Sequence, residues 1–363
     1  RGEWWRKDAV KSARPAVPGG TRVSWRRRGQ APVLGLVLTV LQGCQADPGY
    51  GGRSSAEWAG QLQDAPARER EEAARALGAV LSLNPRLTAP TTALIAALSD
   101  TVDAVRIAAA QALAQPGVRV KAVTGGALGA MLADSSHAAV RIQAVRALGV
   151  LASNAVDTVA RRALVRAILP LHRDPDATVR ATVAATLTEA LTETLARTQA
   201  PGARLEIDAV LEGLARDTMH APRAAALAGL ALAMAARVVP AFTQAARDSS
   251  PAVRALAAGA LGRVTNDAAV GNAAMASLLA LVTDRAPAVR LAAVQALGTR
   301  TASYAPAVDA ALRVASRDTN VLVQQEARHA LTRFHARGGT DPVALEPTRA
   351  ERCAQLPPRT RGC

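Results

Sequence analysis

Aromatic residues are scarce in this sequence, whose 363 residues include only four Trp, two Tyr and two Phe. Hydrophobic residues nevertheless make up 50% of the chain, so a large core must be built mainly from Ala, Leu and Val. Ala is the strongest helix former, and small side chains let helices approach one another closely. The composition therefore predicts an all-helical protein.

Lysine is almost absent: Lys7, Lys11 and Lys121 are the only lysines, and the other residues of the Lys and Arg total are arginines. The net charge of +15 would suit a nucleic-acid ligand, although nearly half of this excess lies in residues 1–44. An Arg- and Ala-rich chain is also what a GC-rich genome produces. Residues 59–363 contain only three aromatic side chains, which provide no platform for stacking bases. The composition thus disfavours nucleic acid as a partner.

Catalytic motifs are also missing. The sequence contains no Gly-x-Ser-x-Gly, no phosphate loop ending in Gly-Lys-Ser/Thr, no His-Glu-x-x-His and no Cys-x-x-Cys. His137, His172 and His220 fall in or near the turns of different units, and His329 and His335 are six residues apart on one segment. We therefore expect no catalytic residues, no metal site and no cofactor.

The chain repeats itself. The stretch "APAVRLAAVQALG" (286–298) follows "SPAVRALAAGALG" (250–262) after 36 residues, and an Asp precedes each stretch at Asp284 and Asp248. Alignment on an Asp and on the Arg six positions later yields eight units, with steps of 31 to 43 residues between the Arg positions. A period of this length is typical of a solenoid. The pairs are Asp64/Arg70, Asp100/Arg106, Asp134/Arg141 (one residue longer), Asp174/Arg180, Asp217/Arg223, Asp248/Arg254, Asp284/Arg290 and Asp318/Gln324.

Each unit carries one apolar stripe. Leu stands seven positions after the Arg in all eight units, Ala or Val stands three positions after it, and Val precedes the Arg in six units. Gly78, Gly149, Gly262 and Gly298 follow that Leu and predict the end of the helix. A second apolar segment ends just before the Asp, as in 91–100, 208–217 and 273–284. Each unit is therefore predicted to be a helix, a tight turn and a second helix, and the pairs must stack to bury their stripes.

The pattern D-x-x-x-x-V-R-x-x-A-x-x-A-L resembles HEAT repeats, particularly the short bacterial type akin to phycobilisome-lyase repeats, over roughly residues 55–335. The resemblance implies an all-α protein: a right-handed α-solenoid of about eight HEAT-like helix-turn-helix repeats, with the second helices on the concave side. The His-Glu pairs with which HEAT-type deoxyhypusine hydroxylases bind iron are absent, and nothing in the sequence marks a bilin pocket.

The Asp and Arg positions have two interpretations. They could offer a row of charges to a ligand. Alternatively, each Asp accepts N–H groups at the start of the second helix, and each Arg pairs with an Asp of its own or a neighbouring unit. We favour this structural Asp/Arg ladder, which comprises Asp100, Arg106, Asp134, Arg141, Asp174, Arg180, Asp217, Arg223, Asp248, Arg254, Asp284 and Arg290.

A partner-binding surface is expected five positions after each Arg, away from the core stripe. The candidates are Arg75, Gln111, Arg146, Gln295 and His329, and Ala185, Ala228 and Gly259 occupy the middle of the row. A surface that is mixed at its ends and small in its middle suits a protein or peptide better than a phosphate backbone. We expect the protein to be monomeric.

The step of 43 residues between units four and five includes "TETLARTQAPGAR" (192–204). Pro201 and Gly202 are helix breakers, so this segment predicts a longer loop or a kink in the solenoid.

The N-terminal region contains "VSWRRRGQAPVLGLVLTVLQGC" from Val23: three Arg, an apolar run too short to span a bilayer, and a Cys. It resembles the lipobox of bacterial lipoproteins, which implies a signal peptide over 23–43 and lipidation of Cys44. A short buried helix or a chance apolar stretch is the alternative. If residues 23–43 are a signal peptide, translation would start near Val23, and residues 1–22 would be upstream read-through or a leader.

The remaining boundaries follow from these features. Residues 44–57 are predicted to be a flexible tether that ends in a capping box of Ser54 and Glu57, before a solenoid over 58–335. Residues 336–363 are predicted to be a disordered tail, in which Cys353 and Cys363 either pair or stay free.

The sequence thus predicts a non-enzymatic scaffold or adaptor that binds a protein or peptide on its concave surface. It would be lipid-anchored in the bacterial cell envelope, on the periplasmic side or at the cell surface. The alternative is a cytosolic HEAT-repeat protein that binds nucleic acid or acts as a lyase-like accessory factor.

Overall fold

The computed structural model describes residues 47–115, 122–134, 136–197, 201–233, 238–264, 268–299 and 305–336. All of them belong to one compact unit that begins at Asp47. The predicted leader and signal peptide, Cys44, and the tail from residue 337 with Cys353 and Cys363 lie outside the described residues. The predictions for those segments therefore stay predictions.

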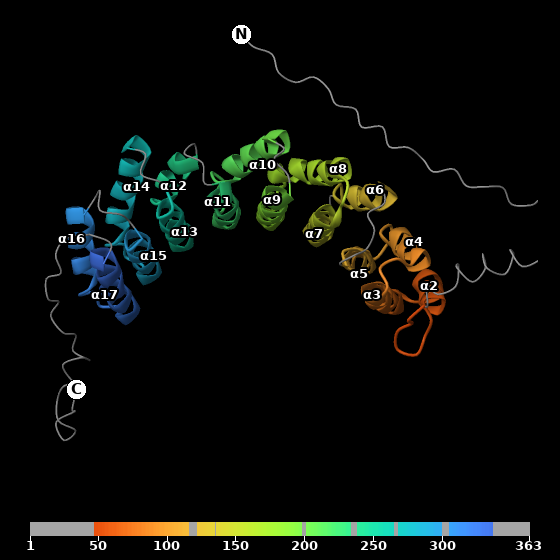
Figure 1. The fold of residues 1–363 in the computed structure, drawn as a ribbon. Coiled ribbons are helices and arrows are strands. Elements are labelled where there is room, and N and C mark those ends of the chain that lie inside the picture. The colour runs from red at the N-terminus through yellow and green to blue at the C-terminus, as the bar shows by residue number, and fades with distance from the viewer. Residues whose placement is uncertain are drawn as a thin grey trace, which may run out of the picture. The chain divides into compact units, whose positions relative to one another are not determined.

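The regular elements of the described residues are helices, arranged as eight consecutive pairs (Figure 1). The first helices are α2 (Ser55–Asp64), α4 (Thr88–Ala97), α6 (Ala122–Met131), α8 (Thr158–Ile168, continued by the 3₁₀ turn η1, Leu169–Arg173), α10 (Pro201–Leu214), α12 (Val239–Ala245), α14 (Ala268–Leu281) and α16 (Ala305–Ala315). The second helices are α3 (Ala67–Leu83), α5 (Asp103–Leu113), α7 (Ala138–Asn154), α9 (Ala177–Arg197), α11 (His220–Ala233), α13 (Pro251–Leu261), α15 (Pro287–Leu297) and α17 (Val321–Ala336). The predicted all-α solenoid of about eight helix pairs is confirmed.

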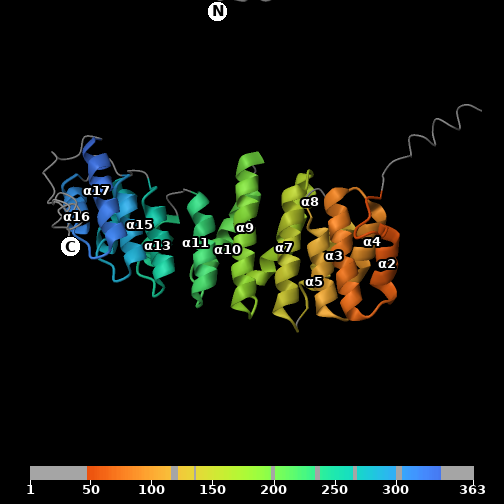
Figure 2. The same ribbon diagram turned by 90° about the horizontal axis from the view of Figure 1, so that it is seen from below.

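The helices of this unit form two layers. Each second helix packs against the second helix of the next unit, from α3 against α5 to α15 against α17. The first helices form the outer layer, and the second helices line the inner side of the bend (Figure 1). Viewed from that inner side, the second helices stand side by side in one row (Figure 2).

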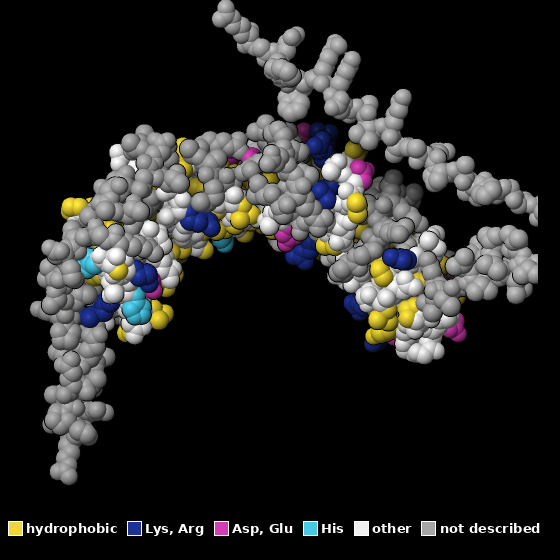
Figure 3. All heavy atoms as spheres, in the orientation of Figure 1, with side chains coloured by type: hydrophobic (Ala, Val, Ile, Leu, Met, Phe, Trp, Pro, Cys, Tyr) yellow, Lys and Arg dark blue, Asp and Glu magenta, His cyan; other side chains and the backbone are white. Residues whose placement is uncertain are grey.

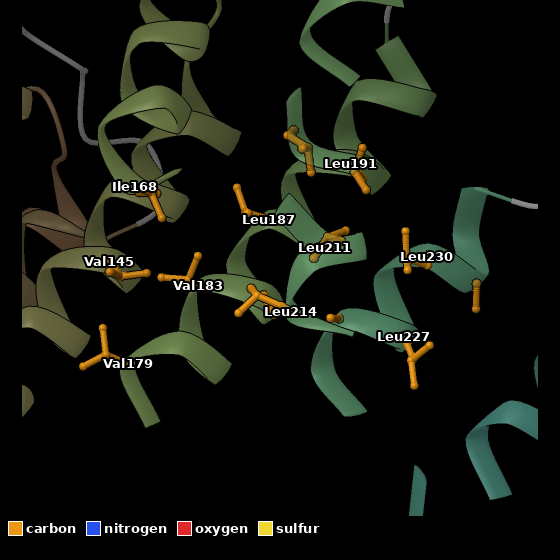
Figure 4. Close-up of a cluster of buried hydrophobic side chains, with 14 of the residues drawn as sticks. Val145, Ile168, Val179, Val183, Leu187, Leu191, Leu211, Leu214, Leu227 and Leu230 are labelled. Carbon is orange, nitrogen blue, oxygen red and sulfur yellow. The ribbon is translucent and has the colours of Figure 1, made fainter. Parts of the chain in front are cut away.

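The repeated stripe forms the core between the layers. The Leu seven positions after the ladder Arg is at most 2% exposed in every unit, from Leu77 to Leu331. In the middle of the row, Val183 and Leu187 of α9, Leu211 of α10 and Leu230 of α11 belong to one cluster of buried side chains (Figure 4). Because each unit covers the stripe of its neighbour, no single pair buries its own apolar surface.

The sequence predicted that the four repeated glycines end helices, but only two of them do. Gly262 and Gly298 are the C-caps of α13 and α15, but Gly78 and Gly149 lie inside α3 and α7. A Cβ on Gly149 would lie 2.3 Å from Thr186 Cγ2. A Cβ on Gly78, Gly262 or Gly298 would lie 2.7–2.9 Å from the Cβ of Ala112, Ala296 or Ala330. At these four positions the neighbouring second helix therefore leaves no room for a Cβ.

One unit reverses this arrangement. Thr188 occupies the glycine position of unit four, and Gly229 faces it from α11 of unit five. A Cβ on Gly229 would lie 2.4 Å from Thr188 Oγ1. At this contact the residue without a side chain therefore lies on the second of the two helices.

The prediction of a longer loop over 192–204 is wrong for most of its residues. Helix α9 continues to Arg197, and α10 begins at Pro201, which leaves only residues 198–200 between the two helices. Proline lacks an N–H group, which the first turn of a helix does not use, so Pro201 begins a helix here. The additional residues lengthen α9, which protrudes from the row in Figure 2.

The predicted tether is partly folded. The capping box is confirmed: Ser54 Oγ accepts from Glu57 N, and Glu57 Oε2 accepts from Ser54 N. Asp47 also caps α2 by accepting from Ser55 N at 2.7 Å, and Trp58 Nε1 donates to Tyr50 O at 2.9 Å. Residues 47–57 are therefore part of the folded region rather than a flexible tether, because these hydrogen bonds hold the turn 47–54 against the first helix.

Candidate binding face

Seven rungs of the Asp/Arg ladder join neighbouring units. Each Arg donates to the Asp of the next unit, with N–O distances of 2.6–2.9 Å. The rungs are Arg70–Asp100, Arg106–Asp134, Arg141–Asp174, Arg180–Asp217, Arg223–Asp248, Arg254–Asp284 and Arg290–Asp318. Six rungs are bidentate, through Nε and Nη2. In the exception, Oδ1 of Asp134 accepts from Ser136 N and His137 N, and Arg106 reaches only Oδ2.

Each rung also closes the turn of its own unit. Arg254 Nη1, for example, donates to the carbonyl oxygen of Asp248, and the Asp248 carboxylate accepts from Ser250 N at 2.8 Å. The Asp therefore binds backbone N–H groups of its own turn and the guanidinium of the preceding unit. The sequence left open whether each Arg binds an Asp of its own unit or of a neighbouring unit. In all seven rungs the Arg binds the Asp of the next unit, and Arg106 also binds Asp103 of its own unit.

The ladder shifts the ionisation of its members. The hydrogen bond from Arg lowers the pKa of Asp100, Asp217, Asp284 and Asp318, and it outweighs the opposing effect of burial. The pKa of Asp248 is also lowered: burial raises it, but the hydrogen bonds from Arg223 and Ser250 together prevail. The same bonds raise the pKa of the paired arginines, such as Arg180 and Arg290. The ladder charges neutralise one another and offer little net charge to a ligand.

The ladder ends where the units end. Asp318 accepts from Arg290, but Gln324 replaces the Arg of the last unit. On α17, Arg333 binds Glu326 and His335 Nε2 lies 2.8 Å from Asp309 Oδ1. These polar side chains occupy the last helix pair, against which no further unit packs among the described residues.

The predicted partner-binding row is exposed along its whole length. Arg75, Gln111, Arg146, Gln295 and His329 are all exposed, and so are Ala185, Ala228 and Gly259 between them. The row lies on the second helices, on the inner side of the bend (Figure 1). On the side of the described residues that Figure 3 shows, basic side chains appear as separate spots rather than as one patch. The face is therefore a long, mixed surface.

Two depressions lie at the N-terminal end of this face, and Arg75 lines both. One, of about 280 Å³, lies between α3 and α5 and is lined by Gly78, Ala108, Gln111 and Ala112. The other, of about 600 Å³, is bounded by Tyr50, Arg53, Trp58, Glu69 and Glu72. Arg75 forms an ion pair with Glu71 on its own helix and keeps 66% of its side chain exposed. Small residues at the helix contact and polar residues around it therefore line depressions at this end of the face.

The described residues contain neither a metal-binding cluster nor a membrane-spanning helix. Among the described residues, no group of three or more His, Cys, Asp or Glu is placed to hold a metal ion. Within the same ranges, no helix combines the length and apolar character that crossing a membrane requires.

The HEAT repeat family matches residues 238–268, which span α12 and α13. No curated protein matches the sequence. The fold is similar to that of YibA from Escherichia coli, with 17% identity, a TM-score of 0.52, and coverage of 85% of this chain and 100% of YibA.

It is also similar to Kap95p, whose structure was solved in a study of its binding to RanGDP, with 14% identity and a TM-score of 0.52. That match covers 77% of this chain but only 45% of Kap95p. Human deoxyhypusine hydroxylase matches more distantly, at 19% identity and a TM-score of 0.33, with coverage of 84% of this chain and 99% of the hydroxylase. Residues 238–268 thus match the HEAT repeat, and the described helix pairs stack in a fold similar to that of YibA and Kap95p.

Proposed function

We propose that the protein is a non-enzymatic scaffold that binds a protein or peptide along the second-helix face and is lipid-anchored in the bacterial cell envelope through Cys44. The single observation that carries the binding proposal is the continuous exposure of the row from Arg75 to His329. HEAT-repeat folds of this kind provide extended concave binding surfaces. Kap95p, which has a similar fold, binds a protein partner.

The chemistry of the face suits a polypeptide. Gln111 and Gln295 offer amide donors and acceptors, Arg75 and Arg146 offer guanidinium groups, and the middle of the row is small enough for a close approach of another backbone. Arg is enriched in protein interfaces, and polar rims around small apolar centres are typical of them. Because the ladder arginines are already paired, the face does not have the continuous positive charge that a phosphate backbone needs.

Site-specific photo-crosslinking tests the face. A photoreactive amino acid would be placed at Gln111, Ala185 or Gln295, and the matched controls would be Ala96, Ala276 and Ala310, which are exposed on first helices. We expect the same protein adduct from at least two face positions and none from the controls. Adducts of equal yield on both layers, or only from the first helices, would contradict binding through this face.

The anchor is tested separately. The native-start protein would be fractionated beside Cys44→Ala, and the intact mass of the membrane fraction would be measured. We expect a lipid mass on Cys44 and membrane retention only in the wild type. If both forms stay unprocessed in the cytoplasm, the envelope localisation is wrong, and a nucleic-acid screen becomes the next experiment.

A further inference from the structure

The turns that join first to second helices carry a row of arginines in units four to eight. We call them the turn arginines: Arg173, Arg216, Arg247, Arg285 and Arg317. Each is adjacent in sequence to a ladder Asp, and each is exposed. In the sequence this recurrence is hidden, because each turn arginine is next to an Asp of opposite charge. It becomes visible once that Asp is assigned to the ladder.

The ladder itself aligns these arginines. Because Arg180 binds Asp217 and Arg223 binds Asp248, consecutive turns are held side by side. The turn arginine precedes the Asp in units four, five, six and eight and follows it in unit seven, so all five belong to this edge. The turns run along the lower edge of the row in Figure 2. Packed helices are typically about 8–10 Å apart, so this edge carries roughly one guanidinium per 10 Å.

The charge of this edge is not cancelled. In the turns of units five to eight (215–220, 246–251, 283–287 and 316–321) the ladder Asp, already bound to the preceding Arg, is the one acidic residue. Within the described ranges, Arg216, Arg247, Arg285 and Arg317 form no side-chain ion pair. Only Arg173 differs, because it contacts His172 and shares its turn with Asp176.

Apolar side chains are exposed on the same edge. Met219 in the turn of unit five is 48% exposed, and Val321 and Leu322 at the turn of unit eight are 60% and 63% exposed. Val314, three residues before Arg317, is 60% exposed. Arginine next to exposed aliphatic residues is the chemistry of a membrane interface, where the charge meets lipid headgroups and the apolar groups enter the acyl boundary.

We propose that the turn edge of units four to eight docks onto the surface of an anionic phospholipid bilayer, independently of any lipid on Cys44. A nucleic acid would use the arginines but not the exposed Val321 and Leu322. At physiological ionic strength the Debye length is about 8 Å, so each guanidinium acts almost independently, and binding must weaken as salt rises. The docking would lay the row of helices along the membrane and leave the second-helix face open.

Vesicle sedimentation tests this proposal with the full chain carrying Cys44→Ala, which removes any contribution from acylation. The vesicles contain phosphatidylglycerol and phosphatidylcholine, or phosphatidylcholine alone. The row variant combines Arg216→Gln, Arg247→Gln, Arg285→Gln and Arg317→Gln. The matched control combines Arg68→Gln, Arg86→Gln, Arg162→Gln and Arg263→Gln, which remove the same charge from exposed positions elsewhere.

We expect binding to anionic vesicles only, and a loss of at least about tenfold in the row variant, since each basic residue near an anionic surface contributes up to about fivefold. The control variant should bind like the parent. Val321→Ser with Leu322→Ser should also weaken binding, because the apolar contribution is lost. Circular dichroism should show all variants folded, because the substituted side chains are exposed.

Four results would overturn the proposal: no binding to anionic vesicles, equal losses in the row and control variants, unchanged binding after the Val321 and Leu322 substitutions, or binding of a short DNA duplex without vesicle binding. The last result would assign the edge to nucleic acid. None of them bears on acylation of Cys44 or on crosslinking from the second-helix face, so the two proposals fail independently.

Discussion

Arg141 and Asp174 form the rung in which both side chains are less than 10% exposed, at 9% and 5%. Nε and Nη2 of Arg141 donate to the two carboxylate oxygens at 2.8 and 2.9 Å, and Nη1 donates to the Asp134 carbonyl. This one guanidinium therefore joins unit three to unit four and closes the turn of unit three. Its burial makes it the rung that is most costly to break.

Arg141→Met is expected to lower the free energy of unfolding by about 3–5 kcal/mol, because it leaves the Asp174 carboxylate buried without its partner. Arg141→Met with Asp174→Asn should recover part of this loss, since Asn keeps an acceptor for Asp176 N and removes the charge. Urea unfolding measures both. As a control, Arg75→Met should change stability by less than about 1 kcal/mol because Arg75 is mostly exposed. A double variant no more stable than Arg141→Met would contradict this account.

Stability should fall in acid. The folded-state pKa values of Asp100, Asp217, Asp284 and Asp318 are lowered, so these carboxylates stabilise the fold above their unfolded pKa of about 4 and lose that contribution as pH falls through the lowered values. The urea midpoint should be nearly constant from about pH 7 to about pH 5 and should drop below about pH 4. In Arg290→Gln the drop should be shallower, because Asp318 loses its main stabilising partner. An equally steep drop in that variant would argue against the ladder as its source.

Gly149→Ala should destabilise the protein by about 1–3 kcal/mol, because the added Cβ would meet Thr186 of the next second helix. Gly60→Ala should instead stabilise it by up to about 1 kcal/mol, since nothing lies within 4 Å of the added Cβ and Ala is the better helix former. The pair Gly149→Thr with Thr186→Gly reproduces the arrangement of Thr188 and Gly229 and should restore much of the stability. Thermal unfolding of the three variants checks the order, and a neutral Gly149→Ala would refute close helix contact there.

The turn before α2 should contribute to stability. Asp47→Ala and Ser54→Ala each remove a side-chain acceptor for an N–H group at the start of α2, and each should cost about 1 kcal/mol. Trp58, buried and hydrogen-bonded to Tyr50, is a fluorescent probe of this end. Ser99→Ala, at an exposed turn position, is the control and should have no effect. If Asp47→Ala were equally silent, residues 47–54 would behave as the tether that the sequence predicted.

The sequence by itself determined the helix pairs. Every unit has a Leu at the same position, seven residues after the ladder Arg, and this pattern predicts a helix with a buried apolar stripe. The period, the stripe and the exposed row from Arg75 to His329 therefore followed from the sequence without a structure. Local chemistry determined the capping box of Ser54 and Glu57 in the same way, because its partners are three residues apart.

Only the tertiary structure decided what depends on contacts between units. The partner of Arg141 lies 33 residues away, and no local pattern distinguishes it from the Asp of the same unit. In the sequence, Gly149 predicts a helix end because glycine is common at helix ends. In the structure, glycine is required at this position because Thr186 on the neighbouring helix leaves no room for a Cβ. The turn arginines look like scattered charge until the ladder places their turns side by side. Each of these depends on how one unit is set against the next, and that geometry comes from the packing of whole helices, which a single unit does not contain.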